Sequence, residues 1–472
     1  MATHPLAEIP PERRIYANRT LNMRSIRAIG YDMDYTLIHY RVEEWERGAY
    51  EQARSSLLER GWPVEDLRFD PTTVIRGLTL DLELGNLVKP TRFGYIIKAK
   101  HGTSAIDYDR LRRAYHGTVV DLSEDRFVFL NTLFSLSEAA LYAQLVDLLD
   151  EGRLPGRMSY ADVYRTVRTT IDEAHMEGAL KDRITADPDR FVVPDPETAA
   201  ALLDQQRAGK RLLLITNSGW DYTRRMMPYA LDPYLPDGLT WRNLFEVIIV
   251  SASKPGFFEG RRPFFQIVDE EQGLLSPHPG PAEPGKVYFG GNAADLEETL
   301  GISGDHILYV GDHLFADVHV SKALLRWRTA LILRELESEV RDQNEFVSSE
   351  ERLKDLMSQK EHMERQLALL HLDRQHAKTA GENTRQHTAA LEDLRRDLSK
   401  LDEDISPLAR AAGELRNEAW GPLMRSGNDK SLFARQVERY ADVYTSRASN
   451  FLYETPFAFL RAARGSLPHD PA

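Results

Sequence analysis

Four apolar runs along the chain each end abruptly at polar or charged side chains. They are residues 29–31, 212–215, 247–250 and 307–310. Short apolar runs bounded by turn residues are typical of buried strands. Acidic side chains at the carboxyl end of a buried strand are costly unless a cation or a chemical task holds them there. The ends of these four runs are therefore the first candidates for a functional site.

A long insertion, residues 41–184, separates the first run from the second and has the pattern of a folded unit. It contains apolar runs at 74–75, 127–134 and 139–149, and the last of these has helical spacing. In the stretch 164–181, helical spacing places Arg168, Asp172 and His175 on one face. Gly178 is expected to end that helix, which leaves Lys181 on the following turn.

Residues 336–416 are rich in charged side chains and Leu, and they carry two apolar seams with 3-4 spacing. One runs from Leu353 to Leu370 with Lys360 in a single polar slot, and the other from Leu391 to Leu408 without a break. A turn signal around Gly381 separates them. The pattern predicts an antiparallel helical hairpin with arms of roughly 20 residues each. It leaves open whether the seams pack on each other or on another subunit.

Composition narrows the classes of function. The chain has 472 residues, enough for two or more structural units, and no cysteine, so no disulfide or thiolate metal site. Its net charge of −13, from 60 basic and 73 acidic residues, disfavours a nucleic-acid polymer as partner. We find no apolar run of membrane-spanning length and no signal-peptide pattern, and therefore expect a cytoplasmic protein without membrane contact.

The polar ends of the four runs match a known set of motifs. The first is Asp32-Met-Asp34-Tyr-Thr36-Leu37, and the others end in Thr216-Asn217-Ser218, in Lys254-Pro255 and in Gly311-Asp312 with Asp317 five residues on. A lone Asp-x-Asp is more often a strand end and a solvated turn. Four such motifs in this order resemble the haloacid dehalogenase superfamily of phosphatases and phosphotransferases.

That resemblance implies a mechanism and a cofactor. Asp32 would attack phosphorus, and Asp34, on the same side of an extended backbone, would protonate the leaving oxygen and later activate water. Thr216, Asn217 and Ser218 would contact phosphate oxygens, and Lys254 would neutralise Asp32 and the phosphoryl group. Mg²⁺ would be held by Asp32, the backbone carbonyl of Asp34 and Asp312, with Asp317 close by or acting through water.

A closer resemblance covers nearly the whole chain. Segments 18–23, 69–78, 129–134, 168–181, 288–292 and 432–442 are similar to the cytosolic purine 5′-nucleotidases, which prefer IMP and GMP. This similarity implies contacts to the base and phosphate from Arg168, Asp172, Lys181, Thr216, Asn217, Ser218 and Lys254, with Phe134 and His175 against the purine face. A carboxylate can accept from N1–H of a 6-oxopurine, and a guanidinium can donate to O6 and N7. For the Arg168–Asp172 pair alone, an ion pair on a solvated helix face is the competing interpretation.

The expected architecture follows from the same resemblance. It is an α/β fold with a Rossmann-like parallel sheet core and helices on both faces, a large cap inserted after the first motif, and a C-terminal helical hairpin. The core should comprise residues 1–40 and 185–335, and the cap residues 41–184. The hairpin should comprise residues 336–416, and residues 417–472 should pack back on the core.

The sequence therefore predicts a Mg²⁺-dependent 5′-nucleotidase for purine nucleoside monophosphates, possessing an aspartyl-phosphate intermediate and a potential phosphotransferase activity, that forms a homo-oligomer. Two alternatives stay open. The same chemistry could serve another small phosphate ester, or the hairpin could belong to a non-catalytic interaction protein.

Overall fold

The computed structural model describes residues 9–176, 178–463 and 465. It contains two compact units. One runs up to Glu337 and resumes at Leu423, and the other comprises Ser338–Pro422. We describe each unit by itself.

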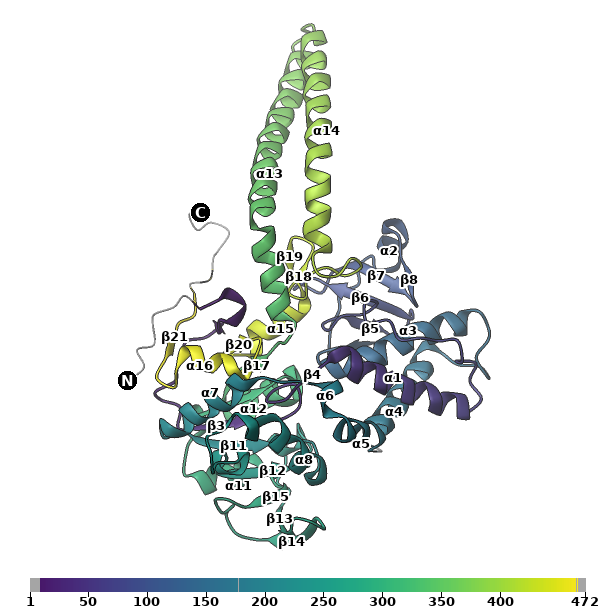
Figure 1. Ribbon diagram of the computed structural model, residues 1–472. Helices are drawn as coiled ribbons and strands as arrows, with labels where there is room; N and C mark the ends of the chain where they lie inside the picture. The colour runs from purple at the N-terminus through teal and green to yellow at the C-terminus, as the bar shows by residue number, and fades with distance from the viewer. Residues whose placement is uncertain (1–8, 177, 464, 466–472) are drawn as a thin grey trace. The chain divides into compact units, whose positions relative to one another are not determined.

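A ten-stranded sheet forms the centre of the larger unit (Figure 1). Its strands run parallel from β20 to β15, and antiparallel strands flank this run at both edges. In spatial order they are β1 (Tyr16–Ala17), β20 (Val443–Thr445), β17 (Arg328–Ile332), β16 (Ile307–Gly311), β3 (Ala28–Tyr31), β11 (Arg211–Ile215), β12 (Val247–Val250), β15 (Val287–Gly290), β13 (Phe264–Asp269) and β14 (Leu274–His278).

Both faces of this sheet are covered by helices. One face packs against α10 (Gly256–Glu259), α11 (Ala293–Leu300) and α12 (Val320–Leu325) in a cluster that includes Leu213 and Tyr309. On the other face Tyr31 donates to Gln205 Oε1 of α7 (Pro196–Arg207) at 2.8 Å. Side chains alternate along a strand, so strands that are apolar throughout are the expected result of two covered faces. The Rossmann-like α/β class predicted from the sequence is confirmed.

The inserted segment leaves and re-enters this core through two paired strands. β4 (His39–Tyr40) and β10 (Val192–Val193) are antiparallel, with Tyr40 opposite Val192. Between them lie a five-stranded antiparallel sheet and a group of helices. The sheet contains β8 (Ser104–Ala105), β7 (Ile96–His101), β6 (Asn86–Pro90), β5 (Thr79–Asp81) and β9 (Phe127–Phe129), and the helices are α1 (Val42–Glu59), α2 (Tyr108–Ala114), α3 (Leu136–Asp150), α4 (Tyr160–Met176), α5 (Ala179–Ala186) and α6 (Pro188–Phe191).

Three of these inserted helices pack on one another. α1, α3 and α4 meet pairwise, and Glu46 of α1 accepts the backbone N–H of Ser137 at the start of α3 at 2.8 Å. The interior faces of α4 are apolar, with Val163, Val167 and Ile171 buried. The charged residues at 168 and 172 are thereby left on a different face of the same helix.

The chain after the hairpin returns to the central sheet. β20 adds a parallel strand beside β17, and β21 (Phe459–Leu460) pairs with β2 (Leu21–Asn22). Between these strands α15 (Leu432–Tyr440) and α16 (Phe451–Glu454) contribute Phe433, Val437 and Phe451 to the buried interior. Across the described residues, we find no helix with the combination of length and apolarity that a membrane crossing requires.

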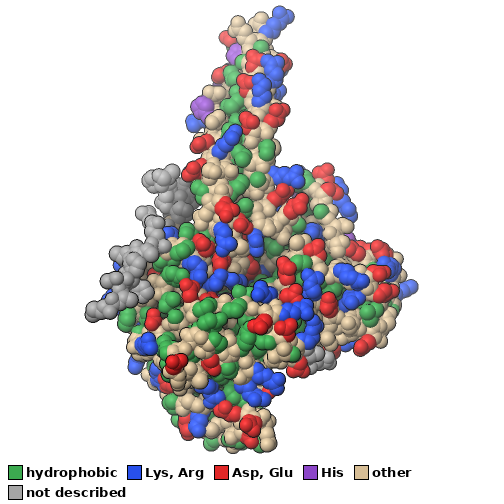
Figure 2. All heavy atoms as spheres, viewed as in Figure 1, with side chains coloured by type: hydrophobic (Ala, Val, Ile, Leu, Met, Phe, Trp, Pro, Cys, Tyr) green, Lys and Arg blue, Asp and Glu red, His purple; other side chains and the backbone are tan. Residues whose placement is uncertain are grey.

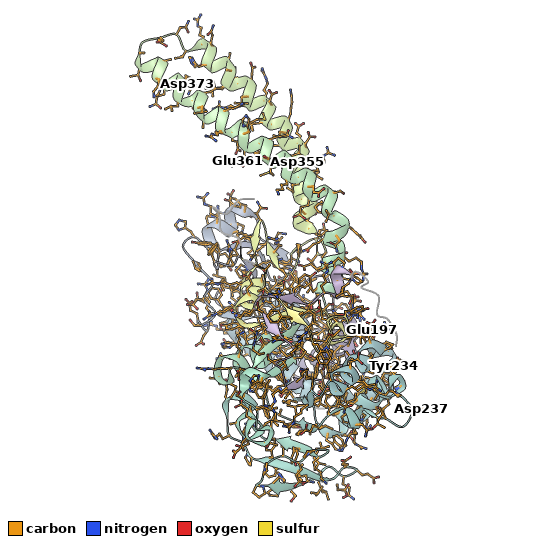
Figure 3. The ribbon with its side chains drawn as sticks, turned by 90° about the vertical axis from the view of Figure 1, so that its left-hand side faces the viewer. Glu197, Tyr234, Asp237, Asp355, Glu361 and Asp373 are labelled. Atoms are coloured by element: carbon orange, nitrogen blue, oxygen red, sulfur yellow. The ribbon has the colours of Figure 1, made fainter. Side chains whose placement is uncertain are left out.

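The smaller unit is a pair of long helices, α13 (Leu336–Thr379) and α14 (Arg385–Glu414), drawn side by side in Figure 1. Their 44 and 30 residues exceed the arms of roughly 20 residues predicted from the seams, because charged residues beyond an apolar seam still form helix. The seams face each other within the chain. Lys360, in the one polar slot, reaches across to Asp402 at 2.6 Å, while Asp355, Glu361 and Asp373 lie exposed along the outside (Figure 3). Figure 2 shows charged side chains spread over the hairpin surface.

Candidate active site

The four motifs come together because their strands are neighbours. β16, β3, β11 and β12 are consecutive in the sheet, and parallel strands end at the same edge. Asp32 follows β3, Thr216 follows β11, and Asp312 follows β16. Lys254 lies four residues beyond β12 and reaches back to the same edge, as its contacts show.

Lys254 is the central charge of the site. Its Nζ lies 2.9 Å from Asp32 Oδ1 and 2.8 Å from Asp317 Oδ1, and it donates to the hydroxyl of Tyr309 at 2.9 Å. Burial by itself would lower the pKa of Lys254, but Asp317 and Asp32 together outweigh it and hold the pKa well above its usual value. The ammonium is therefore a permanent positive charge.

Three buried carboxylates converge beside this lysine. Asp32, Asp312 and Asp317 each offer an oxygen within 4.8 Å of the others. Burial raises the pKa of Asp32 to about 7; Lys254 opposes this shift, and Asp317 and Asp34 add to it. Burial, with Asp317 and Asp32, also raises the pKa of Asp312. Three carboxylates facing one lysine leave an excess of negative charge that a divalent cation would balance.

The donor set fits Mg²⁺. Oδ2 of Asp312 is buried and has no hydrogen-bond partner among the described residues, so it has a free lone pair for a hard cation. Asp317 is held in place by the backbone N–H of His313, which donates to its Oδ2 at 3.1 Å. Gly311 makes room for it, since a Cβ at that position would lie 2.5 Å from Asp317 Oδ2.

Asp34 is not part of the carboxylate cluster, because its side chain is held elsewhere. Its Oδ2 accepts from Ser218 Oγ at 2.5 Å, and its Oδ1 accepts from Tyr40 Oη at 2.6 Å. Ser218 in turn accepts from Nζ of Lys181 at 2.9 Å. A hydrogen-bonded chain therefore runs from the inserted segment to Asp34.

The loop after β11 is fixed by the loop that carries Lys254. Asn217 Oδ1 accepts the backbone N–H of Lys254 at 2.7 Å, and Asn217 Nδ2 donates to its carbonyl at 3.2 Å. Thr216 Oγ1 accepts the backbone N–H of Ser218 at 3.1 Å. Hydroxyl and amide groups held this way form a rigid polar cradle of the kind that suits phosphate oxygens.

The inserted segment supplies the opposite wall of the cavity. Arg168 donates from Nη1 to Glu138 at 2.9 Å and from Nε to Asp172 at 3.1 Å. The Glu138 side chain is 2% exposed, whereas Arg168 and Asp172 are 52% and 49% exposed. Burial raises the pKa of Glu138, and Arg168 opposes that shift. The buried acid thus anchors a cation whose free edge remains open to a ligand. Phe134 packs edge-on against Tyr35 with ring centroids 4.8 Å apart.

Both walls enclose one cavity of about 620 Å³, within the size range of small-molecule sites. The site residues expected from the sequence that line it are Asp32, Asp34, Phe134, Arg168, Asp172, Lys181, Thr216, Asn217, Ser218, Lys254, Asp312 and Asp317. The side chain of His175 lies outside the described residues. Lys181 does not lie on a turn as expected: Gly178, with φ 78°, begins a new helix, α5, and Lys181 lies within it.

Sequence reasoning missed several residues of this site. Glu138 and Tyr164 line the cavity, and Tyr40 and Tyr309 contact the charged groups from behind. Glu138 had a usable signal, since it is an acid at the start of a largely apolar helical run. Tyr40 and Tyr309 had no such signal, because a tyrosine in an apolar run is ordinarily a core residue.

Carboxylates, a lysine and a polar cradle meet at one strand edge, an arrangement that suits the cleavage of phosphate esters. Residues 15–472 match the model of the 5′ nucleotidase family. The chain therefore belongs to the 5′ nucleotidase family, and the resemblance drawn from the sequence is confirmed. Its enzyme class is that of a phosphoric monoester hydrolase.

Relatives at moderate identity match nearly the whole of this chain. The chain is 29% identical over 475 residues to human 5′-nucleotidase domain-containing protein 2, covering 96% of this chain and 85% of the relative. It is 28% identical over 464 residues to a 5′-nucleotidase domain-containing protein of Dictyostelium discoideum, covering 97% and 74%.

Solved structures show only a distant likeness. A "predicted phosphoglycolate phosphatase" from Haemophilus somnus is 12% identical, covering 65% of this chain and 85% of its own, with a TM-score of 0.27. A β-phosphoglucomutase from a Pyrococcus strain is 10% identical, covering 66% and 87%, with a TM-score of 0.32. Scores this low add nothing to the assignment.

Proposed function

We propose that the protein is a Mg²⁺-dependent 5′-nucleotidase that hydrolyses purine nucleoside 5′-monophosphates of the IMP and GMP type. The observation that carries this proposal is the composition of one cavity. Its strand-edge wall holds Asp32, Lys254 and the carboxylate cluster, and its other wall holds an exposed guanidinium and carboxylate at 168 and 172. A phosphate and a purine base could contact these two walls at once.

The proposed reaction has two steps. Asp32 attacks the phosphorus while the bond to the 5′-oxygen breaks, and Asp34 gives that oxygen a proton, which releases the nucleoside. Asp34 then takes a proton from water, which attacks the aspartyl-phosphate, frees phosphate and restores Asp32. Lys254, Thr216 and Asn217 hold the phosphoryl oxygens.

Mg²⁺ would be held by the carboxylates of Asp32 and Asp312 and the backbone carbonyl of Asp34, with Asp317 close by or acting through water. When bound, it would neutralise phosphoryl charge. If a second nucleoside reaches the aspartyl-phosphate before water does, its hydroxyl takes the phosphoryl group, and the enzyme acts as a phosphotransferase. A cytoplasmic location and a homo-oligomeric state stay predictions.

Base recognition is the part of this proposal that a mutation can test. Asp172→Asn replaces a pure acceptor by an amide, so N1–H of a 6-oxopurine loses its charge-assisted partner. Such a hydrogen bond is worth roughly 1.5–3 kcal/mol, so kcat/KM for IMP and GMP should fall about 10- to 150-fold. AMP, which has an acceptor at N1, should lose little, and 4-nitrophenyl phosphate should be hydrolysed as before. Phosphate release across a panel of nucleoside monophosphates and sugar phosphates measures this.

The contacts of α4 show that Asp172→Asn is a specific change and provide a control for it. Arg168 keeps its bond to buried Glu138 when Asp172 is changed, so the variant does not release the guanidinium. Glu173→Gln on the same helix is the matched control, because Glu173 pairs with Arg60 instead, at 2.5 Å. An equal loss on IMP, AMP and the aryl phosphate would reduce Asp172 to an ion pair that supports α4. Preference of the parent enzyme for a sugar phosphate would replace the purine assignment.

A further inference from the structure

We propose that Tyr40 is a positioning residue for Asp34, and that it makes proton transfer by Asp34 depend on the strand where the chain leaves the core. This inference rests on the proposed function, in which Asp34 is the acid and base. The observation behind it is that Asp34 carries two hydroxyl donors, one from inside the cavity and one from behind it.

The two donors divide the carboxylate between them. Ser218 lines the cavity and contacts Oδ2, while Tyr40 contacts Oδ1 and is 2% exposed. Each bond fixes one oxygen, so together they fix the plane of the carboxyl group. Tyr40 thereby turns Oδ2 toward the cavity, where a leaving oxygen would lie.

A second tyrosine orients the first. The hydroxyls of Tyr40 and Tyr222 lie 2.9 Å apart. When Tyr40 gives its single proton to the ionised Asp34, it can only accept from Tyr222. The ring of Tyr222 lies beneath Nζ of Lys181, 4.9 Å from its centroid. Lys181 of the inserted segment thus contacts one donor of Asp34, Ser218, directly, and the other, Tyr40, only through Tyr222.

The position of Tyr40 in the fold couples its hydrogen bond with Asp34 to the inserted segment. Tyr40 belongs to β4 and pairs with Val192 of β10, at the two crossings between core and insertion. Its ring packs against Trp45 of α1, with centroids 4.5 Å apart. A shift of the insertion that moves β4 therefore moves the donor on Asp34. Asp32 directly follows β3 and is tied to the sheet through its backbone N–H, which donates to the carbonyl of Val310 at 2.9 Å, so it is not moved.

The chemistry separates this role from a merely structural one. A nucleoside leaves as an alkoxide and needs the proton of Asp34, whereas 4-nitrophenolate leaves without one. Hydrolysis of the aspartyl-phosphate needs Asp34 as a base whichever group has left. A residue that positions Asp34 should therefore matter in both steps for a nucleotide and in the second step alone for the aryl ester.

Tyr40→Phe tests the inference, since it keeps the ring against Trp45 and removes only the hydroxyl. In pre-steady-state measurements on the full chain with Mg²⁺ and excess substrate, release of inosine from IMP in the first turnover should slow about 10- to 100-fold, with KM little changed. Release of 4-nitrophenolate in the first turnover should stay within about two-fold of the parent. Its later turnovers should slow, giving a burst of one equivalent per enzyme.

Tyr35→Phe is the matched control. The ring of Tyr35 packs against that of Tyr40, with centroids 5.3 Å apart. The hydroxyl of Tyr35 is buried and has no hydrogen-bond partner among the described residues. It should leave both substrates unaffected. An equal slowing of the first turnover on both substrates by Tyr40→Phe, or no slowing with IMP, would overturn the inference. If the parent enzyme releases nothing from nucleotides, the proposed function fails, and the burst with the aryl ester still decides the role of Tyr40.

Discussion

Lys254 shows how much of the chemistry depends on single contacts. Its ammonium touches Asp32, Asp317 and the Tyr309 hydroxyl at once. The same charge that keeps Asp317 in place also opposes protonation of Asp32. Burial of the nucleophile favours the neutral acid, and the ammonium of Lys254 favours the ionised form that attacks phosphorus.

Asp32→Asn removes the attacking charge and keeps the shape of the side chain. We expect turnover of every phosphate ester to fall by several orders of magnitude, because an amide oxygen does not attack phosphorus. The folded structure should be retained, as judged by circular dichroism. Turnover is measured as phosphate released in a fixed-time assay. Activity within about ten-fold of the parent would exclude the aspartyl-phosphate route.

Among the helices and strands, sequence patterns predicted those whose apolar residues follow a local pattern. The four buried strands and their polar ends follow from runs of Ile, Leu and Val, and α4 follows from its periodicity. The five-stranded sheet of the insertion could not be predicted in this way, because apolar and polar residues do not alternate along its strands. In β6, Asn86 and Lys89 are buried beside Leu87 and Val88, and Asn86 donates to the Tyr115 hydroxyl at 2.8 Å. A buried polar residue with a distant partner is indistinguishable from a loop residue in one sequence.

The same limit applies to the site. Asp32 and Asp312 were predictable because each directly follows an apolar strand, and Asp34 and Asp317 because of their spacing from those two residues. Tyr40 and Tyr309 were not, since only the fold places one against Asp34 and the other against Lys254. The length of the hairpin arms was underestimated because apolar spacing marks only the part of each helix that faces its partner.

Gly30 links the sheet to the active centre. A Cβ at this position would lie 2.9 Å from Cδ2 of Tyr309, whose hydroxyl accepts from Lys254 and donates to the carbonyl of Ile215 at 3.0 Å. Gly30→Ala should therefore force the buried ring aside. We expect a loss of about 1–3 kcal/mol in the free energy of unfolding, together with lower phosphatase activity, measured by urea unfolding and phosphate release.

Gly256→Ala serves as the comparison, because nothing lies within 4 Å of the added methyl group and φ needs no glycine there. It should be neutral or slightly stabilising. A Gly30→Ala protein with the parent's unfolding midpoint would mean that the Tyr309 ring accommodates the methyl group without strain.

For the whole molecule, folding brings Asp32 and Asp312 together from distant parts of the chain. The folded state then holds three carboxylates against one lysine, a charge excess that the unfolded chain does not concentrate. A cation that binds only this arrangement must stabilise the fold as a whole. Global stability therefore reports on the cation site without any assay of activity.

We expect Mg²⁺ to raise the melting temperature of the protein by a few degrees, since a cation at 100 times its Kd contributes about 2.7 kcal/mol. Asp312→Asn should abolish most of that increase, because it removes the carboxylate whose Oδ2 has no other partner among the described residues. In the absence of divalent cations the variant should melt at or above the parent's temperature, because it no longer buries an uncompensated charge. Asp221→Asn, a change at an exposed carboxylate of α8 (Trp220–Leu231), should keep the full Mg²⁺ response. Differential scanning calorimetry with and without Mg²⁺ measures all three proteins, and an undiminished Mg²⁺ shift in Asp312→Asn would place the cation elsewhere.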